Sequence, residues 1–323
     1  MAARIINGQD YAERIKQGLT EQVAELQSAG RTVHLVAVQV GQNLASQVYT
    51  NMQARNCESV GIRYQLLDLP ETTGQPELAE ELSRLNRDGR VSGIILQMPL
   101  PPHLDAQAAQ LAIDPDKDVE GIHPMNLGRL FSGGEGLAPC TAQAAYELLL
   151  EACPDLGGKQ AVIVGRSDIV GKPIALLLLQ RSRPSPTVTI CHSHTRDLAQ
   201  HTRKADIVIV ATGASQLTWQ RHRAAVAAGK KVPPPNLRPL VTADMLGEQA
   251  VVIDVATNRI PKGLDAGGQP LKDDQGKAIM ITAGDVEFEA ASRKVAAITP
   301  VPGGVGPVTV AMLLRNTVRC AMG

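Results

Sequence analysis

Aromatic side chains are scarce in this chain. Its 323 residues include two Phe, four Tyr and one Trp, although 44% of the residues are hydrophobic. A core with so few rings must be aliphatic, and Val, Ile and Leu are the residues that fill the buried strands of parallel sheets. The length is sufficient for two domains. The composition therefore suits an α/β protein with a parallel sheet.

Excess charge, long apolar runs and closely paired cysteines are lacking as well. Lys plus Arg and Asp plus Glu both total 32, which argues against a nucleic acid or a membrane surface bound by bulk electrostatics. No apolar run approaches the length of a membrane span, and the first eight residues lack the core of a signal peptide. The five cysteines have no C-x-x-C spacing. We therefore expect a cytoplasmic protein with free thiols, no metal and no disulfide.

Strand-like and helix-like segments alternate along the first half. Helical spacing covers residues 12–28, 46–60 and 75–88, and β-rich runs cover 33–40, 64–69 and 93–97. This order predicts βαβ units with a parallel sheet. It places Gln97 at the carboxyl end of a strand, where open α/β sheets bind ligands. Residues 127–137 have no clear period and are expected to form a loop, before a helix capped by Thr141.

The second half begins with a clean strand at 160–164, followed by a glycine-containing turn and an apolar helix from residue 173. Further strands are predicted at 187–191, 206–211 and 250–255. The turn reads Gly165-x-Ser167-x-x-x-Gly171 and meets a helix N-terminus, where free N–H groups and the helix dipole attract a phosphate. The spacing differs from G-x-G-x-x-G, so by itself it fits a structural turn as well as a nucleotide site.

The end of the second strand of this half bears on the choice of nucleotide. An NAD-selective site usually has Asp or Glu there to bind the ribose hydroxyl, but residues 191–196 contain no carboxylate. Arg166, Ser193 and Arg196 are instead suited to a 2′-phosphate, which favours NADP. His192 and His194 fit solvated loop residues and phosphate contacts equally well.

Residues 299–309, Thr-Pro-Val-Pro-Gly-Gly-Val-Gly-Pro-Val-Thr, combine three prolines with three glycines before an apolar helix. A rigid turn before a terminal helix explains them as well as a binding loop does. The stretch closely resembles, however, the signature of the bifunctional methylenetetrahydrofolate dehydrogenase/cyclohydrolase family. Three other segments are similar to that family in the same order, and together they span nearly the whole chain. They are residues 45–62, residues 93–130 with Gln97-Met-Pro-Leu-Pro and Asp118-Val-Glu-Gly, and residues 165–173.

The resemblance implies an N-terminal α/β substrate domain over 1–139, completed by 300–323, and a Rossmann-like NADP-binding domain over 140–299. The terminal helix would return to the first domain, and the protein would be a homodimer. A tetrahydrofolate one-carbon derivative would be the substrate. Catalytic roles would fall to Tyr49, Gln53, Gln97 and Glu120, with Pro302 and Gly303 lining the substrate site. The cofactor would contact Gly165, Arg166, Ser167, Ser193 and Thr257.

Two positions depart from the family pattern. The family has a lysine four residues after its tyrosine, and this chain has Gln53 after Tyr49. The family usually has Asp-Val-Asp-Gly where this chain has Glu120. The pair Tyr49 and Gln53 lies on one face of a helix, which by itself is more typical of a polar helix edge than of a site.

The departures predict a changed reaction. Hydride transfer to nicotinamide needs orientation more than a protein base, whereas hydration of a methenyl cation needs acid–base help that an amide cannot give. We therefore expect a dehydrogenase with little or no cyclohydrolase activity. An enzyme that stays bifunctional through another base, a non-catalytic folate- or NADP-binding relative, and a different pterin carrier are the alternatives.

Two segments lie outside the resemblance. Residues 214–240 and 259–283 are longer than the family's connections, and the first is basic. We expect solvated loops there. The alternative is a lid or a partner surface.

Overall fold

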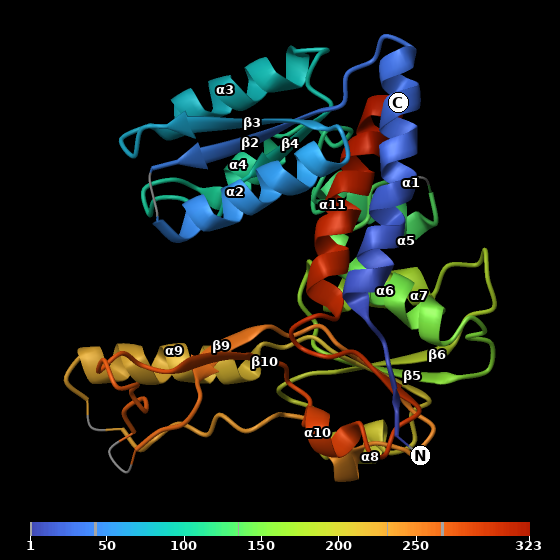
Figure 1. Ribbon diagram of the computed structural model, residues 1–323, viewed down its shortest axis with the longest axis vertical. Coiled ribbons are helices and arrows are strands. Elements are labelled where there is room, and N and C mark those ends of the chain that lie inside the picture. Colours follow the sequence, from blue (N-terminus) through green and yellow to red (C-terminus); the bar gives the residue numbers. More distant parts are fainter. Residues whose placement is uncertain (1, 42–43, 135, 231, 266–267) are drawn as a thin grey trace. The chain divides into compact units, whose positions relative to one another are not determined.

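The computed structural model describes residues 2–41, 44–134, 136–230, 232–265 and 268–323, without the side chains of residues 44–49 (Figure 1). The chain forms two compact units. The N-terminal unit comprises Asp10–Gln143 and Pro307–Gly323, and the central unit comprises Ala144–Gly306 with the residues up to Gln9. Each unit has its own parallel sheet. The expected two-domain α/β fold is therefore confirmed.

The N-terminal unit is built on a three-stranded parallel sheet. Its order is β3(Arg63–Leu69), β2(His34–Val40), β4(Gly93–Leu96). Every residue of β2 is buried, as expected for a central strand with both faces covered. Helices α2(Leu44–Ser59) and α3(Gln75–Arg87) follow β2 and β3. The apolar residues of α3 that are buried, Leu78, Leu82 and Leu85, recur at helical spacing and share a core cluster with β2 and β4.

Further helices of this unit are α1(Gly8–Ser28), α4(Ala106–Leu111), α5(Pro124–Ser132), α6(Cys140–Ala152), which continues into the central unit, and α11(Val305–Met322). Helix α11 returns to the N-terminal unit as expected, and Figure 1 shows it in red beside the blue α1. The fully buried amide of Asn316 on α11 donates to the carbonyls of Val119 (2.9 Å) and Ala138 (3.3 Å). Arg31 donates to carbonyls in the last turn of the helix.

The central unit contains a six-stranded parallel sheet. Its order is β1(Arg4–Ile5), β11(Ala297–Ile298), β8(Val251–Asp254), β7(Ile207–Val210), β5(Gln160–Val164), β6(Thr187–Cys191). Four short elements connect these strands: α7(Gly171–Leu178), α8(Leu198–Thr202), the 3-10 turn η1(Ala243–Met245) and α10(Phe288–Ala291). The core is aliphatic, with Val162, Val208 and Val252 at its centre. Strands β6 and β7 flank β5 on opposite sides. The chain thus changes direction at the carboxyl end of β5, a switch point of the kind at which such sheets bind ligands.

The loop expected over 127–137 is wrong in its first half, because α5 covers Pro124–Ser132. Pro124 supplies the preset backbone angle of a first helical turn, and His123 Nδ1 accepts the Met125 N–H at 3.1 Å. The buried residues Asn126 and Leu130 lie four apart on one face. Gly128 weakens this pattern in the sequence. The cap expected at Thr141 is also wrong, since α6 begins one residue earlier, at Cys140.

The two segments expected to be solvated loops, residues 214–240 and 259–283, are not simple loops. The first contains α9(Ala214–Ala227), and the second contains the antiparallel pair β9(Asn258–Pro261) and β10(Met280–Ala283). On α9, the rings of Trp219 and His222 stack with centroids 5.8 Å apart. These two residues line a cavity of about 450 Å³ together with Met280. A lid or partner surface stays a prediction.

Candidate functional site

A pair of amides lies where the sheet of the N-terminal unit ends. Gln97 follows β4 directly, and Gln53 lies in α2. Gln97 Nε2 donates to Gln53 Oε1 at 3.0 Å, and the two side chains are 6% and 3% exposed. The structure thus brings together two of the residues predicted from the sequence. Tyr49 lies one turn earlier in α2, and its side chain is outside the described residues.

A third residue joins the two amides. The hydroxyl of Tyr64, half-buried on β3, donates to Gln53 Oε1 at 3.3 Å. Tyr64 was not among the residues predicted from the sequence. The sequence predicts that α2 and β3 are neighbours in a βαβ unit. It does not indicate which residue of the strand contacts Gln53.

Glu120 lies in a turn that begins beside the end of β4. A parallel bridge pairs Ile94 of β4 with Asp118, so Glu120 lies two residues beyond the bridge, just as Leu96 does on the strand. The Glu120 side chain is half-buried. Burial, reinforced by the negative charge of Asp118, raises the pKa of Glu120 to about 7. No described residue donates a hydrogen bond to its carboxylate.

Asp118, two residues earlier, has a different role. It is fully buried and accepts hydrogen bonds from the backbone of His123 (2.8 Å) and the side chains of Asn126 (3.2 Å) and Gln110 (3.4 Å). Burial raises its pKa, and the donors at His123 and Asn126 oppose that shift. Its acceptor capacity is therefore used within the fold, and Asp118 shapes the turn that presents Glu120.

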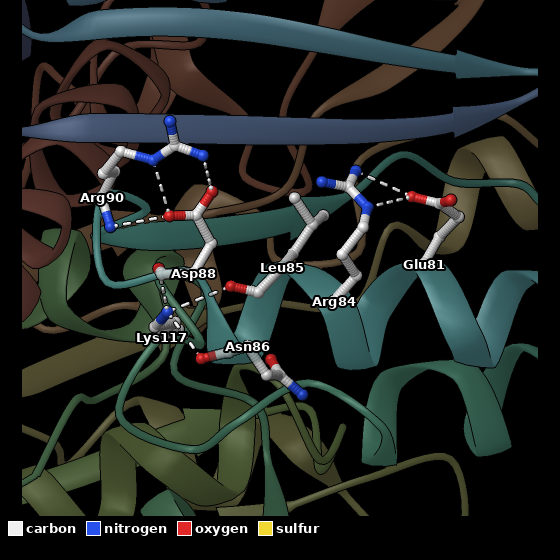
Figure 2. A network of polar contacts seen from close by, with 7 residues as sticks. All are labelled: Glu81, Arg84, Leu85, Asn86, Asp88, Arg90 and Lys117. Atoms are coloured by element: carbon white, nitrogen blue, oxygen red, sulfur yellow. Dashed lines mark hydrogen bonds and ion pairs between the residues drawn. The ribbon is translucent and has the colours of Figure 1, made fainter.

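Lys117 fastens the start of the same segment, as Figure 2 shows. Its ammonium donates to three carbonyls at the C-terminal end of α3, those of Leu85 (3.0 Å), Asn86 (2.8 Å) and Asp88 (2.8 Å). A cation there satisfies carbonyls that a helix leaves unpaired and complements the helix dipole. The Asp88 side chain pairs in turn with Arg90 at 2.8 Å. The segment leading to Glu120 is thus anchored to α3 as well as to β4.

In the central unit, the turn after β5 requires glycine at two positions. Gly165 has φ of +130°, and a Cβ there would lie 2.3 Å from the Ala211 carbonyl oxygen after β7. A Cβ on Gly171 would lie 2.3 Å from the Gly165 carbonyl oxygen. Ser167 Oγ accepts the Gly171 N–H at 3.3 Å at the start of α7. This bare backbone at a switch point, leading into a helix N-terminus, fits a nucleotide phosphate.

The other residues predicted to contact the cofactor lie at the same edge of the sheet. Ser193 follows β6 and Thr257 follows β8, and both are exposed, as is Arg166 after β5. The pKa of His192 is lowered by partial burial and by the nearby Arg166 and His194. His192 Nδ1 accepts the backbone N–H of His194 at 3.1 Å. One ring nitrogen of His192 is thus engaged within the loop.

Two buried carboxylates that sequence reasoning missed support this edge. Asp285 is fully buried and accepts from the Thr212 hydroxyl, the Gly213 N–H (2.8 Å) and the Asn258 amide (2.9 Å). Asp254, at the end of β8, accepts the N–H groups of Asp285 (3.2 Å) and Val286 (2.9 Å). Burial raises the pKa of Asp254 to about 7. In the sequence, the feature that could have indicated these carboxylates is their position as polar residues at the ends of apolar strands.

Pro302 and Gly303 lie in the loop before α11. Pro302 is exposed, and Gly303 has φ of +99°. The Gly303 carbonyl accepts the Gly8 N–H at 2.9 Å, and a Cβ on Gly8 would lie 1.8 Å from the Gly304 carbonyl oxygen. The loop is therefore held tightly by backbone contacts within the central unit.

Family models match both halves of the chain. The catalytic-domain model of tetrahydrofolate dehydrogenase/cyclohydrolase matches residues 6–120, and the NAD(P)-binding-domain model of that family matches 139–232 and 225–323. The chain belongs to this family. Its central unit accordingly contains the family's NAD(P)-binding domain. The glycine-containing turn after β5 lies at the switch point of the sheet in that domain. The segment 214–240, where the two matched ranges of the second model meet, contains α9.

Relatives cover the whole length. The bifunctional protein FolD 2 of Geobacter sulfurreducens is 42% identical over 319 residues, which are 99% of this chain and 97% of that protein. The bifunctional FolD of Moorella thermoacetica is also 42% identical, with 99% of each chain covered.

Solved structures of this family have a similar fold. The bifunctional FolD from Campylobacter jejuni has a TM-score of 0.82 at 38% identity, with 99% of each chain covered. The Trypanosoma brucei enzyme, solved with NADP cofactor and inhibitor, has a TM-score of 0.80 at 34% identity and covers 100% of this chain and 98% of its own. Among the described residues, no helix is long and apolar enough to cross a bilayer, and no three metal-binding side chains cluster.

Proposed function

We propose that this protein oxidises 5,10-methylenetetrahydrofolate to 5,10-methenyltetrahydrofolate with NADP and hydrolyses the product weakly or not at all. The observation that carries the proposal is the buried amide pair Gln53–Gln97, whose amides hydrogen-bond at 3.0 Å. Gln53 stands where the resemblance expects a lysine. Family membership supports the dehydrogenase part, and the neutral amide supports the loss of the second activity.

Bound NADP supplies the acceptor for a hydride, which leaves the methylene carbon with its electron pair and yields the methenyl cation. The chain's task in this step is orientation and tolerance of a forming cation. Gln97 and Tyr49 orient the reduced pterin, and Glu120 accepts hydrogen bonds from its amino-pyrimidine edge. Pro302 and Gly303 also contact the substrate. No side chain has to remove a proton.

Hydration of the methenyl group differs in this respect, because water must lose a proton as it attacks. A positioned acid–base group typically contributes about 10²- to 10⁴-fold to such a step. An amide does not titrate near neutral pH, so Gln53 cannot supply that help. The methenyl product is therefore expected to leave the enzyme intact.

The nucleotide assignment rests on Gly165, Arg166, Ser167, Ser193 and Thr257. The bare backbone at Gly165 accommodates the diphosphate, and Ser167 and the start of α7 supply N–H and O–H donors. Arg166 and Ser193 bind the 2′-phosphate. We also propose a homodimer in the cytoplasm; light scattering of the purified protein tests the dimer.

One observation favours a second candidate, an enzyme that stays bifunctional. Glu120 has a pKa raised to about 7, which suits a general base at neutral pH. In that case hydrolysis would rise with pH through an apparent pKa near 7. It would disappear in Glu120→Gln.

The test is an assay of the purified protein with methylenetetrahydrofolate and NADP. NADPH formation and the decay of the methenyl absorbance are followed separately, and the decay is compared with that in buffer. We expect NADPH and methenyl product to form together, with decay at the uncatalysed rate. Gln53→Lys should accelerate decay, and Gln53→Met should not.

Enzyme-dependent decay in the unmodified protein would contradict the proposal, and its pH dependence would then identify or dismiss Glu120 as the base. Binding of NADP without formation of NADPH would indicate the non-catalytic relative. Preference for another reduced pterin over tetrahydrofolate would reassign the carrier.

A further inference from the structure

The hydrogen bonds around Gln53 are unevenly distributed over its amide. The oxygen accepts two, from Gln97 Nε2 at 3.0 Å and from the Tyr64 hydroxyl at 3.3 Å. An amide oxygen has two lone pairs, so both are occupied by the protein. The amide nitrogen, by contrast, is buried and has no hydrogen-bond partner among the described residues.

Buried donors without partners are rare in folded proteins, and each calls for an explanation. Here the explanation lies in the identity of the two neighbours. With Gln97 oriented as it is, turning the Gln53 amide over would set its NH₂ group against the NH₂ group of Gln97, and it would remove the acceptor from the Tyr64 proton. The amide is thus held with its oxygen toward the protein, and its two N–H donors remain for a ligand.

We propose that Tyr64 is a positioning residue that fixes Gln53 as a neutral hydrogen-bond donor to the reduced pterin. This rests on the proposed function, since it places the substrate beside Gln53. The group recognised is an uncharged acceptor of the tetrahydrofolate, a carbonyl oxygen or a ring nitrogen lone pair. The same orientation turns the only acceptor of Gln53 away from the ligand, so that an attacking water finds no proton acceptor there.

Tyr64 is well placed for this role because it comes from a different element. Gln53 and Tyr49 belong to α2, which packs on β3, where Tyr64 lies. A strand residue restrains the helix residue independently of the helix's own side-chain rotations. The restraint should therefore affect how the amide is oriented and not whether the helix forms.

The test is a double-mutant cycle with Tyr64→Phe and Gln53→Met. Both replacements nearly keep the size of the side chain; Tyr64→Phe removes the hydroxyl, and Gln53→Met removes the amide oxygen and the amide NH₂. Binding of tetrahydrofolate is measured by calorimetry without turnover, and the KM for methylenetetrahydrofolate, the KM for NADP and kcat are measured alongside. Tyr146→Phe, a half-buried tyrosine of α6 in the other unit, is the matched control.

We expect Tyr64→Phe to weaken tetrahydrofolate binding and raise the folate KM by about 2- to 10-fold, the effect of one hydrogen bond. The NADP KM, the melting temperature and the Tyr146→Phe control should be unchanged. In the Gln53→Met protein, Tyr64→Phe should have a smaller effect on folate binding, because the bond from Tyr64 to Gln53 is already lost.

An unchanged folate affinity in Tyr64→Phe would overturn the proposal, and so would an equal effect of Tyr64→Phe with and without Gln53. Failure of the proposed function is a separate result. If the unmodified protein binds tetrahydrofolate but does not oxidise the methylene derivative, the binding cycle still decides the role of Tyr64. If it binds no tetrahydrofolate, both proposals fail.

Discussion

The two units use buried polar side chains in opposite ways. In the central unit, Asp285 receives donors from Thr212, Gly213 and Asn258, and its charge is fully engaged by the protein. In the N-terminal unit, no described residue donates to the Glu120 carboxylate, and the Gln53 amide nitrogen has no described partner. Asp285 and Gln53 are both buried and Glu120 is half-buried, but only the polar atoms of Asp285 are fully compensated by the protein.

This difference distinguishes residues that stabilise the fold, the scaffold, from residues that are available to bind a ligand, the binding group. Asp285 ties the loop after β7 to β9 and so shapes the edge on which a nucleotide would lie. Gln53 and Glu120 retain hydrogen-bonding capacity that the fold does not use, at a cost in stability. Such unused capacity is what a ligand can satisfy. Replacing residues of the two kinds should therefore affect different measurements.

The largest effect is expected for Asp285→Ala. It leaves buried donors at Thr212, Gly213 and Asn258 without an acceptor, which should lower the free energy of unfolding by on the order of 3 kcal/mol or more. Thermal unfolding followed by circular dichroism measures it. Gln53→Met is the matched control: it removes the acceptor of Gln97 and Tyr64 but no charge, so it should lower the melting temperature less than Asp285→Ala does. Equal losses of stability in the two variants would erase the distinction between scaffold and binding group.

Glu120→Gln should have the next largest effect, on substrate binding. It exchanges one acceptor for a donor and leaves pterin N–H groups poorly paired, at about 1–3 kcal/mol, or roughly 5- to 150-fold in the folate KM. The NADP KM should not change. In the unmodified protein the folate KM should rise as the pH falls below about 7, because only the ionised carboxylate accepts both bonds. Both effects are measured by steady-state kinetics between about pH 5.5 and 8.5, a range that brackets this pKa.

The same variant has a stability signature of defined sign. The raised pKa means that protonated Glu120 is favoured in the folded state. Its contribution to stability is complete below the unfolded value of 4.5 and is lost as the pH rises through about 7. Glu120→Gln should therefore raise the melting temperature at alkaline pH and not at acidic pH. Glu80→Gln, at an exposed position on α3, should do neither. A folate KM unaffected by Glu120→Gln would remove Glu120 from the substrate site.

A smaller and more selective effect is expected for Arg166→Ala. Arg166 is exposed at the nucleotide edge, where water screens its charge, so we expect the KM for NADP to rise by about 10-fold, the lower end for a charge-assisted hydrogen bond. The KM for NAD should stay the same, because NAD lacks the 2′-phosphate. Arg181→Ala, also exposed, serves as the control. If NAD gives the higher kcat/KM in the unmodified protein, the assignment of NADP is wrong.

The framework of both units could be predicted because it depends on local patterns. Aliphatic runs such as 160–164 and 93–97 coincide with β5 and β4 to within one residue. The helix at Pro124–Ser132 was missed because its buried face consists of Asn126 and Leu130, and an asparagine does not register as apolar. Asn126 is buried because it serves the carboxylate of Asp118, which is a tertiary reason.

The site was predictable in part for the same reason. Gln97 follows from its place at a strand end, and Gln53 and Glu120 from the resemblance to the family. Tyr64 could not be found, because its bond to Gln53 depends on how α2 is rotated over β3. Asp285 likewise acquires its role from Thr212 and Asn258, which are 73 and 27 residues away.

Helix α11 has a consequence for synthesis of the protein on the ribosome. Residues 10–143 emerge early, but the unit that they form includes 307–323. Until α11 arrives, the carbonyls of Val119 and Ala138, on either side of Glu120, lack the amide of Asn316. The central unit can complete its sheet first, since its strands end at Ile298. The half of the protein translated first is therefore the last to mature, and its unfinished apolar surface must be kept from aggregating for the whole of translation.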